Sequence, residues 1–501
     1  MKDIDALVED LLTIRREILE AEAASQEVIG HVHPHYTYSA INFIRYLKLR
    51  TFDLRKLQFR LSALGLSSIS HSERHVLANI ENILHFLFLS KGQHFDGRHN
   101  FGRHPVNLIE SQRVLKKNTN RLLKTEKGGR RTAIMVTLSD KATDYGHVKE
   151  LVMAGMQIAR INCSQGDQIL WQQMVNHVKA AVEETGMACS IYFDLAGPKI
   201  RTSRIKAAGK KNHLLLHAGD LMHLYKDSHF DEASLANTDG KIAIASCAVT
   251  EIFDDVEQGD SIWFDDGKIS GVIEGKCRKY LAIRITKTNP KGGKLREKKG
   301  INLPETNLRL ASLTKEDLDN LPFVTAHADI IGLSFVRKTK DIQMLQEELG
   351  KLNKGDIGLV LKIENKEAFN NLPSLILQGM RSASLGVMTA RGDLAVELGV
   401  ERLSEVQEQI LWLCEAALIP NIWATQVLET LAKKGIAARA EITDAAMSAR
   451  SECVMLNKGD YILEAVKTLV NILERMEKHQ YKKQGTLRLL QVAERFFTPP
   501  L

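Results

Sequence analysis

The sequence predicts an α/β protein built on an eight-stranded (β/α)8 barrel, with a small β domain inserted after barrel strand 3 and an all-α extension in front. Eight short apolar, β-branched runs follow one another between residues 133 and 456, the number that closes a TIM barrel. Helical patterns fill most gaps between the runs. One gap, 196–328, is far too long and contains alternating strand patterns, which indicates an insertion.

The composition is typical of a globular protein that handles small anionic substrates. At 501 residues two or three domains are expected, and 44% hydrophobic with 26% charged residues is ordinary for soluble proteins. A net charge of +7 suits phosphate and carboxylate ligands and does not indicate nucleic acid as a partner. We expect no membrane partner, because no apolar run is long enough to span a bilayer.

Cysteine usage and the amino terminus favour a cytoplasmic location. The six cysteines form no CxxC pair, which argues against disulfides and structural zinc and for a reducing compartment. The start, MKDIDALVEDLL, has acids where a targeting signal would need bases.

Residues 1–125 contain helical patterns and almost no strand signal. Apolar residues recur at helical spacing in 4–24, 41–49 and 54–64. Ser70 followed by Glu73 predicts a capping box that opens a further helix.

Breaks in these helical patterns predict turns and a linker. The stretch 91–105 is rich in glycine and histidine, and KTEKGGRR (124–131) is typical of a flexible linker. For His31, His33 and His35, in HVHPHY, a solvated turn is favoured over a metal site.

The barrel runs and the insertion define the expected domains. Strand patterns in 212–219 and 261–273 belong to the insertion. The predicted divisions are a helical extension 1–125, a barrel 126–203 and 297–480, a β domain 204–296 and a tail 481–501. The barrel strands are predicted at 133–138, 157–162, 190–195, 329–334, 358–363, 384–389, 421–425 and 453–456.

Polar residues gather where these runs end. In such barrels the carboxyl ends of the strands converge on one mouth, which holds the active site. The residues at or just after the ends are Arg160, Asn162, Asp194, Ser334, Lys362, Glu364, Asp393, Thr425 and Lys458. This set predicts chemistry on phosphate with a magnesium ion.

Glu364 and Asp393 are the pair that most clearly predicts a metal site. Carboxylates from neighbouring strand ends are hard oxygen ligands of the kind that magnesium takes, one or two at a time. The alternative is that each acid simply pairs with a base such as Arg391.

Two basic residues in the mouth are suited to chemistry on a phosphate group. Lys362 shares a strand face with Glu364 and would stabilise charge on a transferring phosphoryl group or an enolate. Arg160 offers a planar fork for phosphate. The alternatives are that Lys362 only neutralises Glu364 and that Arg160 makes a rim salt bridge.

Nine ordered motifs across residues 130–475 resemble those of the pyruvate kinase family. They are ARINCSQGD (159–167), DLAGPKIRTS (194–203), WFDDGKISGVI (263–273), KKGINLP (298–304), LSFVRKTKDI (333–342), LKIENKEAF (361–369), TARGDLAVELG (389–399), WATQVLET (423–430) and ARAEITDAA (438–446). The resemblance implies phosphoryl transfer from phosphoenolpyruvate to ADP, which gives pyruvate and ATP with Mg²⁺ or Mn²⁺ as cofactor.

The resemblance also implies a role for each matching residue. Glu364 and Asp393 would bind the magnesium, and Lys362 would stabilise the transferring group. The implied substrate-binding residues are Arg160, Lys362, Gly392, Asp393 and Thr425, with Thr425 near the carbon that gains a proton and Arg160, Lys362 and Thr425 catalytic. The implied nucleotide-binding residues are Asn162, Arg201, Lys299 and Lys458, and the implied potassium ligands are Asn162, Ser164 and Asp194.

Lys199 differs from the family's potassium-requiring members, which have glutamate at this position. An ammonium there supplies the charge otherwise brought by the ion, so the sequence predicts activity without added potassium.

Three further departures lie on the nucleotide side. Leu138–Ala142 replaces an Ile-Gly-Pro-Ala-Ser pattern, Gln165 replaces a histidine, and the loop after the eighth strand is shortened to Lys458–Tyr461. Nucleotide preference is therefore an open question.

The ends of the chain also depart from the family pattern. We expect the family's carboxyl-terminal effector domain to be missing, and the helical extension has no usual counterpart. A homo-oligomer is expected. Two alternatives remain: a magnesium-enolate enzyme with another acceptor, and a non-catalytic metabolite sensor with a partner-binding extension.

Overall fold

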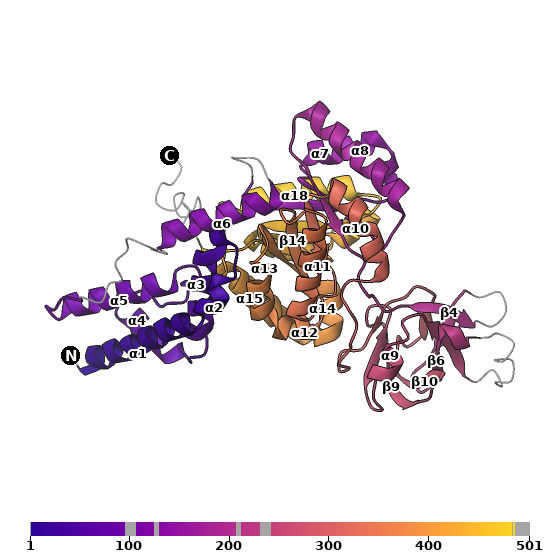
Figure 1. Ribbon diagram of the computed structural model, residues 1–501, viewed down its shortest axis with the longest axis horizontal. Coiled ribbons are helices and arrows are strands. Elements are labelled where there is room, and N and C mark those ends of the chain that lie inside the picture. Colours follow the sequence, from indigo (N-terminus) through magenta and orange to yellow (C-terminus); the bar gives the residue numbers. More distant parts are fainter. Residues whose placement is uncertain are drawn as a thin grey trace, which may run out of the picture.

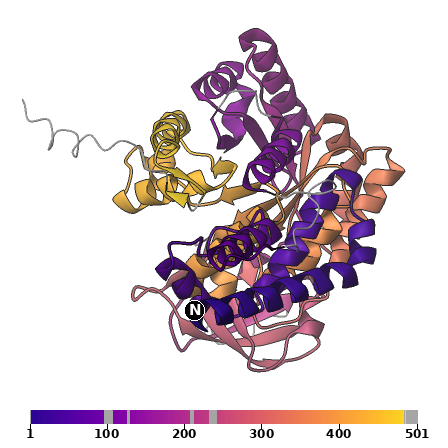
Figure 2. The same cartoon turned by 90° about the vertical axis from the view of Figure 1, so that its left-hand side faces the viewer.

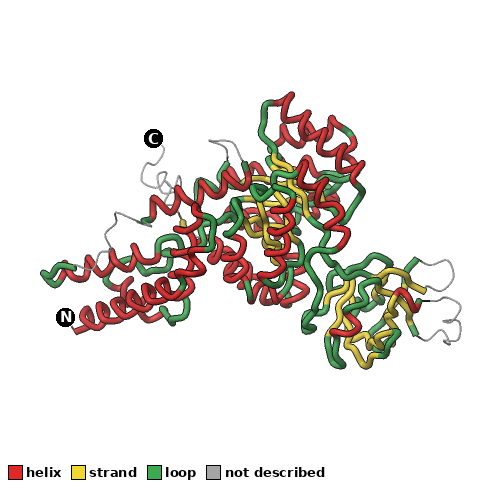
Figure 3. Tube along the Cα trace, in the orientation of Figure 1, coloured by secondary structure: helices red, strands yellow, loops and turns green. Residues whose placement is uncertain are grey.

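The protein is an elongated molecule of three parts, described by a computed structural model for residues 2–95, 107–124, 130–206, 212–230, 242–482 and 484–485. The amino-terminal helices lie at one end, the barrel lies in the middle, and a β domain projects at the other end (Figures 1 and 3). Most of the predicted linker, most of the 91–105 stretch and most of the tail lie outside the described residues.

The central part is the predicted closed barrel of eight parallel strands, in the order β1-β17-β16-β15-β14-β13-β3-β2. Nearly every strand residue is buried, which explains why the strands are continuous apolar runs. The strands are β1 Ala133–Thr137, β2 Ile158–Asn162, β3 Ser190–Asp194, β13 Ile330–Leu333, β14 Gly358–Ile363, β15 Leu385–Ala390, β16 Asn421–Ala424 and β17 Cys453–Leu456. Fold class and strand positions are thus confirmed.

Helices surround the barrel and connect its strands. Asp144 caps the first of them by accepting the Gly146 N–H at 2.9 Å, and Gly155 ends it at φ +116°. The helices are α7 Tyr145–Ala154, α8 Gln168–Thr185, α10 Lys315–His327, α11 Thr339–Lys351, α12 Lys366–Asn370, α13 Leu372–Gly379, α14 Arg391–Leu398, α15 Val400–Ala416, α16 Glu429–Lys434, α17 Arg439–Met447 and α18 Ile462–Met476.

The inserted domain is a seven-stranded sheet in the order β12-β8-β9-β10-β6-β7-β4, with a separate β11-β5 pair. Its own core includes Leu224, Phe264 and Ile283. The sheet strands run from Thr202 to Asn302, slightly beyond the predicted 204–296. They are β4 Thr202–Lys206, β5 Leu214–Leu216, β6 Leu221–Lys226, β7 Ala243–Cys247, β8 Ser261–Phe264, β9 Ile269–Lys276, β10 Tyr280–Lys287, β11 Gly293–Leu295 and β12 Ile301–Asn302, with the short helix α9 Ile252–Asp255.

The amino-terminal helices pack against one another, and part of this bundle packs against the barrel (Figures 1 and 2). They are α1 Lys2–Ala24, α2 Gln26–Gly30, α3 Thr37–Leu49, α4 Arg55–Ala63, α5 Val76–Ser90 and α6 Leu108–Leu123. The remaining short elements are 3-10 turns at Pro34–Tyr36, Asp140–Thr143, Asp227–His229 and Ser448–Arg450, and the β18 Gln480–Tyr481 and β19 Gln484–Gly485 pair.

The capping box predicted at Ser70 and Glu73 is wrong. Helix α5 begins at Val76 after His75, which makes no side-chain cap. Instead the Val76 N–H donates to Asn42 Oδ1 at 3.2 Å, so a residue of α3 satisfies the helix terminus from across the helix interface.

Helix α6 closes the amino-terminal end of the barrel. Leu122 and Leu123 are fully buried in the cluster formed by the barrel's interior side chains. Asn118 Nδ2 donates to the Leu418 carbonyl at 2.8 Å, and the Ser190 hydroxyl donates to the Leu123 carbonyl at 2.9 Å. The last helix of the extension is therefore part of the barrel's core.

The turn around His33 and His35, expected to be solvated, is half-buried and docks on the barrel. The His33 N–H donates to the Met380 carbonyl at 2.8 Å, and the Tyr36 hydroxyl accepts the Leu385 N–H at 2.8 Å. The buried tyrosine draws the turn against the start of β15, so the solvated-turn expectation is wrong.

All six cysteines lie in the described part of the chain and are free thiols. Over the same residues, no helix combines the length and apolarity needed to cross a membrane.

Candidate active site

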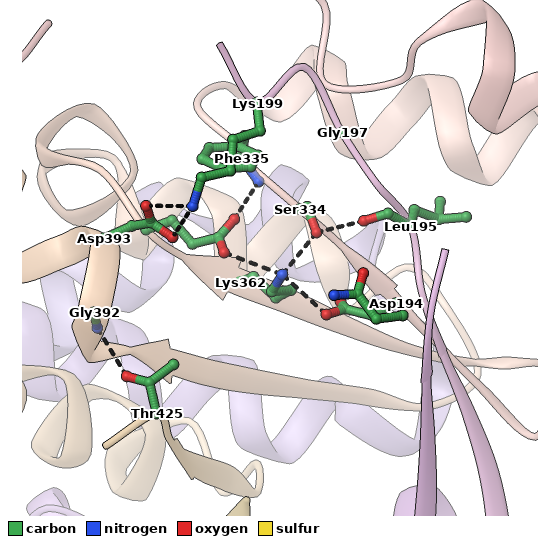
Figure 4. A network of polar contacts seen from close by, with 12 residues as sticks. Asp194, Leu195, Gly197, Lys199, Ser334, Phe335, Lys362, Gly392, Asp393 and Thr425 are labelled. Atoms are coloured by element: carbon green, nitrogen blue, oxygen red, sulfur yellow. Dashed lines mark hydrogen bonds and ion pairs between the residues drawn. The ribbon is translucent and has the colours of Figure 1, made fainter. Parts of the chain in front are cut away.

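Lys362 is the centre of a buried charge network at the carboxyl end of β14. Its ammonium lies 3.0 Å from Glu364 Oε1 and 3.1 Å from Asp194 Oδ2, and it donates to the Ser334 hydroxyl at 2.7 Å (Figure 4). Burial disfavours the ammonium, but the charges of Asp194 and Glu364 outweigh it and raise the pKa of Lys362. The lysine is thus held as a cation inside the barrel mouth.

Glu364 is a buried carboxylate that pairs with Lys362 and accepts a backbone hydrogen bond. Its Oε2 accepts the Phe335 N–H at 2.7 Å. Burial raises the pKa of Glu364, and the negative charges of Asp393 and Asp194 add to the effect, against the opposing charge of Lys362. A divalent ion shared with Asp393 would relieve this repulsion.

Asp393, in the first turn of α14, is held by Lys199 rather than by the neighbouring arginine. The Lys199 ammonium lies 2.8 Å from Asp393 Oδ1 and 3.1 Å from Oδ2, and 5.8 Å from the centre of the Phe335 ring (Figure 4). Arg391 instead pairs with Asp444 at 2.5 Å. Both acids therefore pair with a nearby base, as the simpler alternative expects, but the bases are lysines rather than Arg391: Glu364 pairs with Lys362 and Asp393 with Lys199.

Arg160 lies beside Lys362 because both contact the same carboxylate. Its Nε donates to Asp194 Oδ2 at 3.0 Å and its Nη1 donates to the Thr137 hydroxyl at 2.8 Å. Burial opposes ionisation of Asp194, but the charges of Lys362 and Arg160 outweigh it and lower the pKa of this carboxyl. Asp194 thus orients both cations in the mouth.

Thr425 and Gly392 meet at the end of β16. Thr425 has φ +65°, a left-handed conformation that is strained for a β-branched residue. Its hydroxyl accepts the Gly392 N–H at 2.8 Å, and Arg391 Nη2 donates to its carbonyl at 2.5 Å. Arg391, which sequence reasoning treated only as a partner for the acids, fixes this strained turn.

Of the predicted potassium ligands, Asp194 belongs to the network and Asn162 and Ser164 lie next to it, and Lys199 pairs with none of the three. Asn162 lies opposite Asp194 in the β2-β3 register, and its Oδ1 accepts the Ser164 N–H at 3.0 Å. The ion pair of Lys199 is with Asp393. Its charge therefore enters the mouth on the side of the proposed magnesium ligands.

The predicted nucleotide-binding bases lie on surrounding loops with partners of their own. Arg201 Nη1 donates to the Lys298 carbonyl at 3.1 Å, and Lys299 pairs with Asp265 at 2.8 Å. Lys458 donates to Gln165 Oε1 at 2.7 Å, so it is bonded to one of the residues that depart from the family pattern. Arg201 and Lys299 lie on neighbouring segments, because Arg201 forms a β-bridge with Gly300.

Glu364 and Asp393 are the carboxylates in the mouth that could hold a magnesium ion. Among the residues described, no three His, Cys, Asp or Glu side chains gather as a metal cluster. Magnesium takes one or two carboxylates and completes its octahedron with water and substrate oxygens. Glu364 and Asp393, which interact electrostatically, match that requirement.

Comparison with known proteins gives one consistent result. The family model described as "Pyruvate kinase, barrel domain" matches residues 129–466. The chain is 31% identical to pyruvate kinase of Staphylococcus saprophyticus over 364 residues, 71% of this chain and 58% of that protein. It is 32% identical to pyruvate kinase of Thermotoga maritima over 361 residues, 70% of this chain and 72% of that protein.

A human relative is equally similar. The chain is 32% identical to pyruvate kinase PKLR of Homo sapiens over 368 residues, 71% of this chain and 61% of that protein. The chain thus spans between 58% and 72% of the length of these three relatives.

Proposed function

This chain belongs to the pyruvate kinase family, and we propose that it transfers the phosphoryl group of phosphoenolpyruvate to ADP with the help of Mg²⁺. The observation that carries the proposal is the placement of Lys362 between Asp194 and Glu364, with Asp393 near enough to shift the pKa of Glu364. A buried cation beside two convergent carboxylates is suited to a phosphoryl group moving between two anionic substrates.

Glu364 and Asp393 would hold the magnesium ion. When bound, the ion supplies positive charge to the substrate oxygens. Lys362 contributes a second charge from the strand side, and Arg160 offers its fork to the phosphate while Asp194 keeps it oriented.

In the reaction, the bond between the enol oxygen and phosphorus breaks, and a bond from an ADP oxygen to the same phosphorus forms. The enolate carbon then gains a proton to give pyruvate. We propose that the Thr425 hydroxyl, which accepts the Gly392 N–H, lies near the carbon that gains this proton.

The position of Lys199 supports our proposal that the reaction does not require potassium. Its ammonium pairs with Asp393 at 2.8 Å, so a permanent positive charge already lies beside the proposed magnesium ligand. The measurement is the steady-state rate with and without added KCl at constant ionic strength; a strong potassium requirement would contradict this role.

Arg201, Lys299, Lys458 and Asn162 are proposed to surround the nucleotide phosphates. Their loops differ from the family pattern at Leu138–Ala142 and Gln165, so nucleotide preference must be measured. The cytoplasmic location and the homo-oligomer remain predictions.

A coupled assay tests the function. Phosphoenolpyruvate, Mg²⁺ and a panel of nucleoside diphosphates are supplied to the wild-type protein and to the Lys362→Met and Glu364→Gln variants. We expect ATP and pyruvate from the wild type and strongly reduced rates in both variants. Pyruvate without ATP would favour another acceptor, and equal rates in the three proteins would reject the mechanism.

A further inference from the structure

A second cavity lies beside the active site, between the 303–308 segment that leaves the inserted sheet and the short helix α12. Its volume is about 350 Å³, within the range of small-molecule sites. Charged side chains line much of it, including Arg337, Lys366, Glu305, Glu367 and Glu397. None of these five residues has a role in the proposed reaction.

Arg337 is the unusual group in this cavity. Only 8% of the residue is exposed, yet its Nη1 has no hydrogen-bond partner. Its Nε lies 3.9 Å from Glu367, too far for a hydrogen bond. Buried polar groups nearly always have partners, so Arg337 Nη1 is an unusual donor without an acceptor.

The backbone holds Arg337 in place. Its N–H donates to Asp341 Oδ2 at 2.8 Å, and its carbonyl accepts from Asn371 Nδ2 at 2.9 Å. Because these hydrogen bonds fix the backbone at Arg337, a loosely held segment does not explain why its Nη1 lacks an acceptor.

Acids on the other walls restrict what can bind there. Glu397 is half-buried and accepts from Asn302 Nδ2 at 3.0 Å, and Glu305 and Glu367 also face the cavity. A simple anion on Arg337 would be repelled by three carboxylates, a repulsion that Lys366 and Lys338, whose ammonium lies 3.4 Å from Glu367 Oε1, offset only in part. A simple cation would leave Arg337 Nη1 without an acceptor.

We propose that this cavity binds a small zwitterion, with its carboxylate on the Arg337 guanidinium and its ammonium facing the acids of the opposite wall. Such a ligand satisfies both kinds of charge at once. The cavity shares Arg337, Asn365 and Glu397 with a narrow cleft that reaches Lys199 and Glu364, so the ligand would be a direct neighbour of the active site.

Direct binding to the full-length protein tests the proposal. Isothermal titration uses glycine, β-alanine and 4-aminobutanoate, in which the two charges are progressively further apart. Acetate, methylamine and inorganic phosphate carry one kind of charge only. We expect at least one zwitterion to bind roughly tenfold more tightly than each of these three. No binding by any zwitterion, or tighter binding of phosphate, would overturn the proposal.

Two variants locate the site. Arg337→Gln removes the guanidinium, and Asn370→Trp fills the cavity from its exposed rim without touching the arginine. Each should weaken binding of the same zwitterion roughly tenfold or more, whereas Asn176→Trp, at an exposed position of α8, should not. If Arg337→Gln does not fold, the affinity of Asn370→Trp for the zwitterion tests the location of the site. Wild-type affinity in the folded variants would overturn the assignment.

The titration contains neither phosphoenolpyruvate nor nucleotide, so it is independent of the proposed catalysis. The Lys362→Met variant, in which the rate is expected to be strongly reduced, should bind the zwitterion as the wild type does under conditions where it is folded. Failure of the catalytic proposal would leave this binding unchanged.

Discussion

The two ends of the barrel differ in the chemistry of their interiors. At the amino end, Leu122 and Leu123 of α6 fill the space between the strands, and the nearby polar groups are paired. At the carboxyl end, Lys362, Asp194 and Glu364 place unlike charges in the interior. Stability is therefore expected to depend on both ends, but phosphoryl transfer only on the second.

The largest effect is expected from Lys362→Met. The variant removes the cation shared by Asp194 and Glu364 and leaves their charges uncompensated in the barrel. We expect the rate of phosphoryl transfer to fall roughly 10²–10³-fold and the free energy of unfolding to fall by about 3–5 kcal/mol. Coupled assays and urea unfolding measure the two quantities.

Lys434→Met, an exposed lysine in α16, is the matched control. It should leave rate and stability near wild type. If Lys362→Met kept wild-type activity, the expectation that phosphoryl transfer depends on the carboxyl end of the barrel and not on the amino end would be contradicted.

Leu122→Ala tests the amino end. Leu122 is fully buried, and any Cβ added at Gly358 or Gly386 would come within 2.7 Å or 2.5 Å of its methyl groups, so packing there is tight. The cavity left by the substitution should lower the free energy of unfolding by about 2–5 kcal/mol, with kcat unchanged at temperatures where the variant is folded.

Leu108→Ala, at an exposed position of the same helix, is the control and should change stability by less than about 0.5 kcal/mol. A large loss of kcat in folded Leu122→Ala would show that the two ends are coupled.

Two histidines make the amino-terminal part sensitive to acid. Burial lowers the pKa of His75 to about 4, and the charge of Arg74 adds to the effect. Burial also lowers the pKa of His35 to about 4, helped by Arg121. Their ordinary value is 6.5, so between these values the unfolded chain binds more protons than the folded chain.

The stability contributed by the neutral histidines is complete above pH 6.5 and is lost as the pH falls towards 4. His75 should account for roughly 2 kcal/mol after allowance for its partial exposure. Urea unfolding of wild type and His75→Gln at several pH values between 7 and 5 measures the difference. Parallel pH profiles in the two proteins would contradict the prediction.

The sequence predicts well where a feature depends on local pattern. The strands β14 and β15 are fully buried apolar runs, so their positions follow from hydrophobicity alone. Lys362 and Glu364 lie at the end of such a run. A charged side chain at a buried position is costly unless it is paired with an opposite charge or takes part in function. Both the barrel and the position of this charged pair at a strand end could therefore be predicted.

Features that depend on distant contacts could not be predicted. Asn42 caps α5 from another helix, and nothing near Ser70 distinguishes its pattern from a real capping box. Lys199 and Asp393 meet only because β3 and β15 belong to one closed barrel. Similarly, the amphipathic pattern of α6 does not reveal that it packs on the barrel interior.

The smallest effect is expected at the rim of the carboxyl end, where two loops that depart from the family pattern are joined by an ion pair. Lys141 Nζ lies 2.7 Å from Asp460 Oδ1, and both side chains are exposed. Exposed pairs contribute little to stability, so Lys141→Ala should change Tm by less than about 2 °C.

The same pair is expected to matter more for nucleotide binding than for stability, because both loops lie on the proposed nucleotide side. Lys141→Ala should raise KM for ADP more than KM for phosphoenolpyruvate, and Asp460→Ala should add little to it in the double variant. Because salt screens exposed charges, wild type should approach the variant as KCl increases. Equal changes in both KM values would mean that the pair does not act through nucleotide binding. The rim would then, like the amino end of the barrel, have no specific role in the reaction.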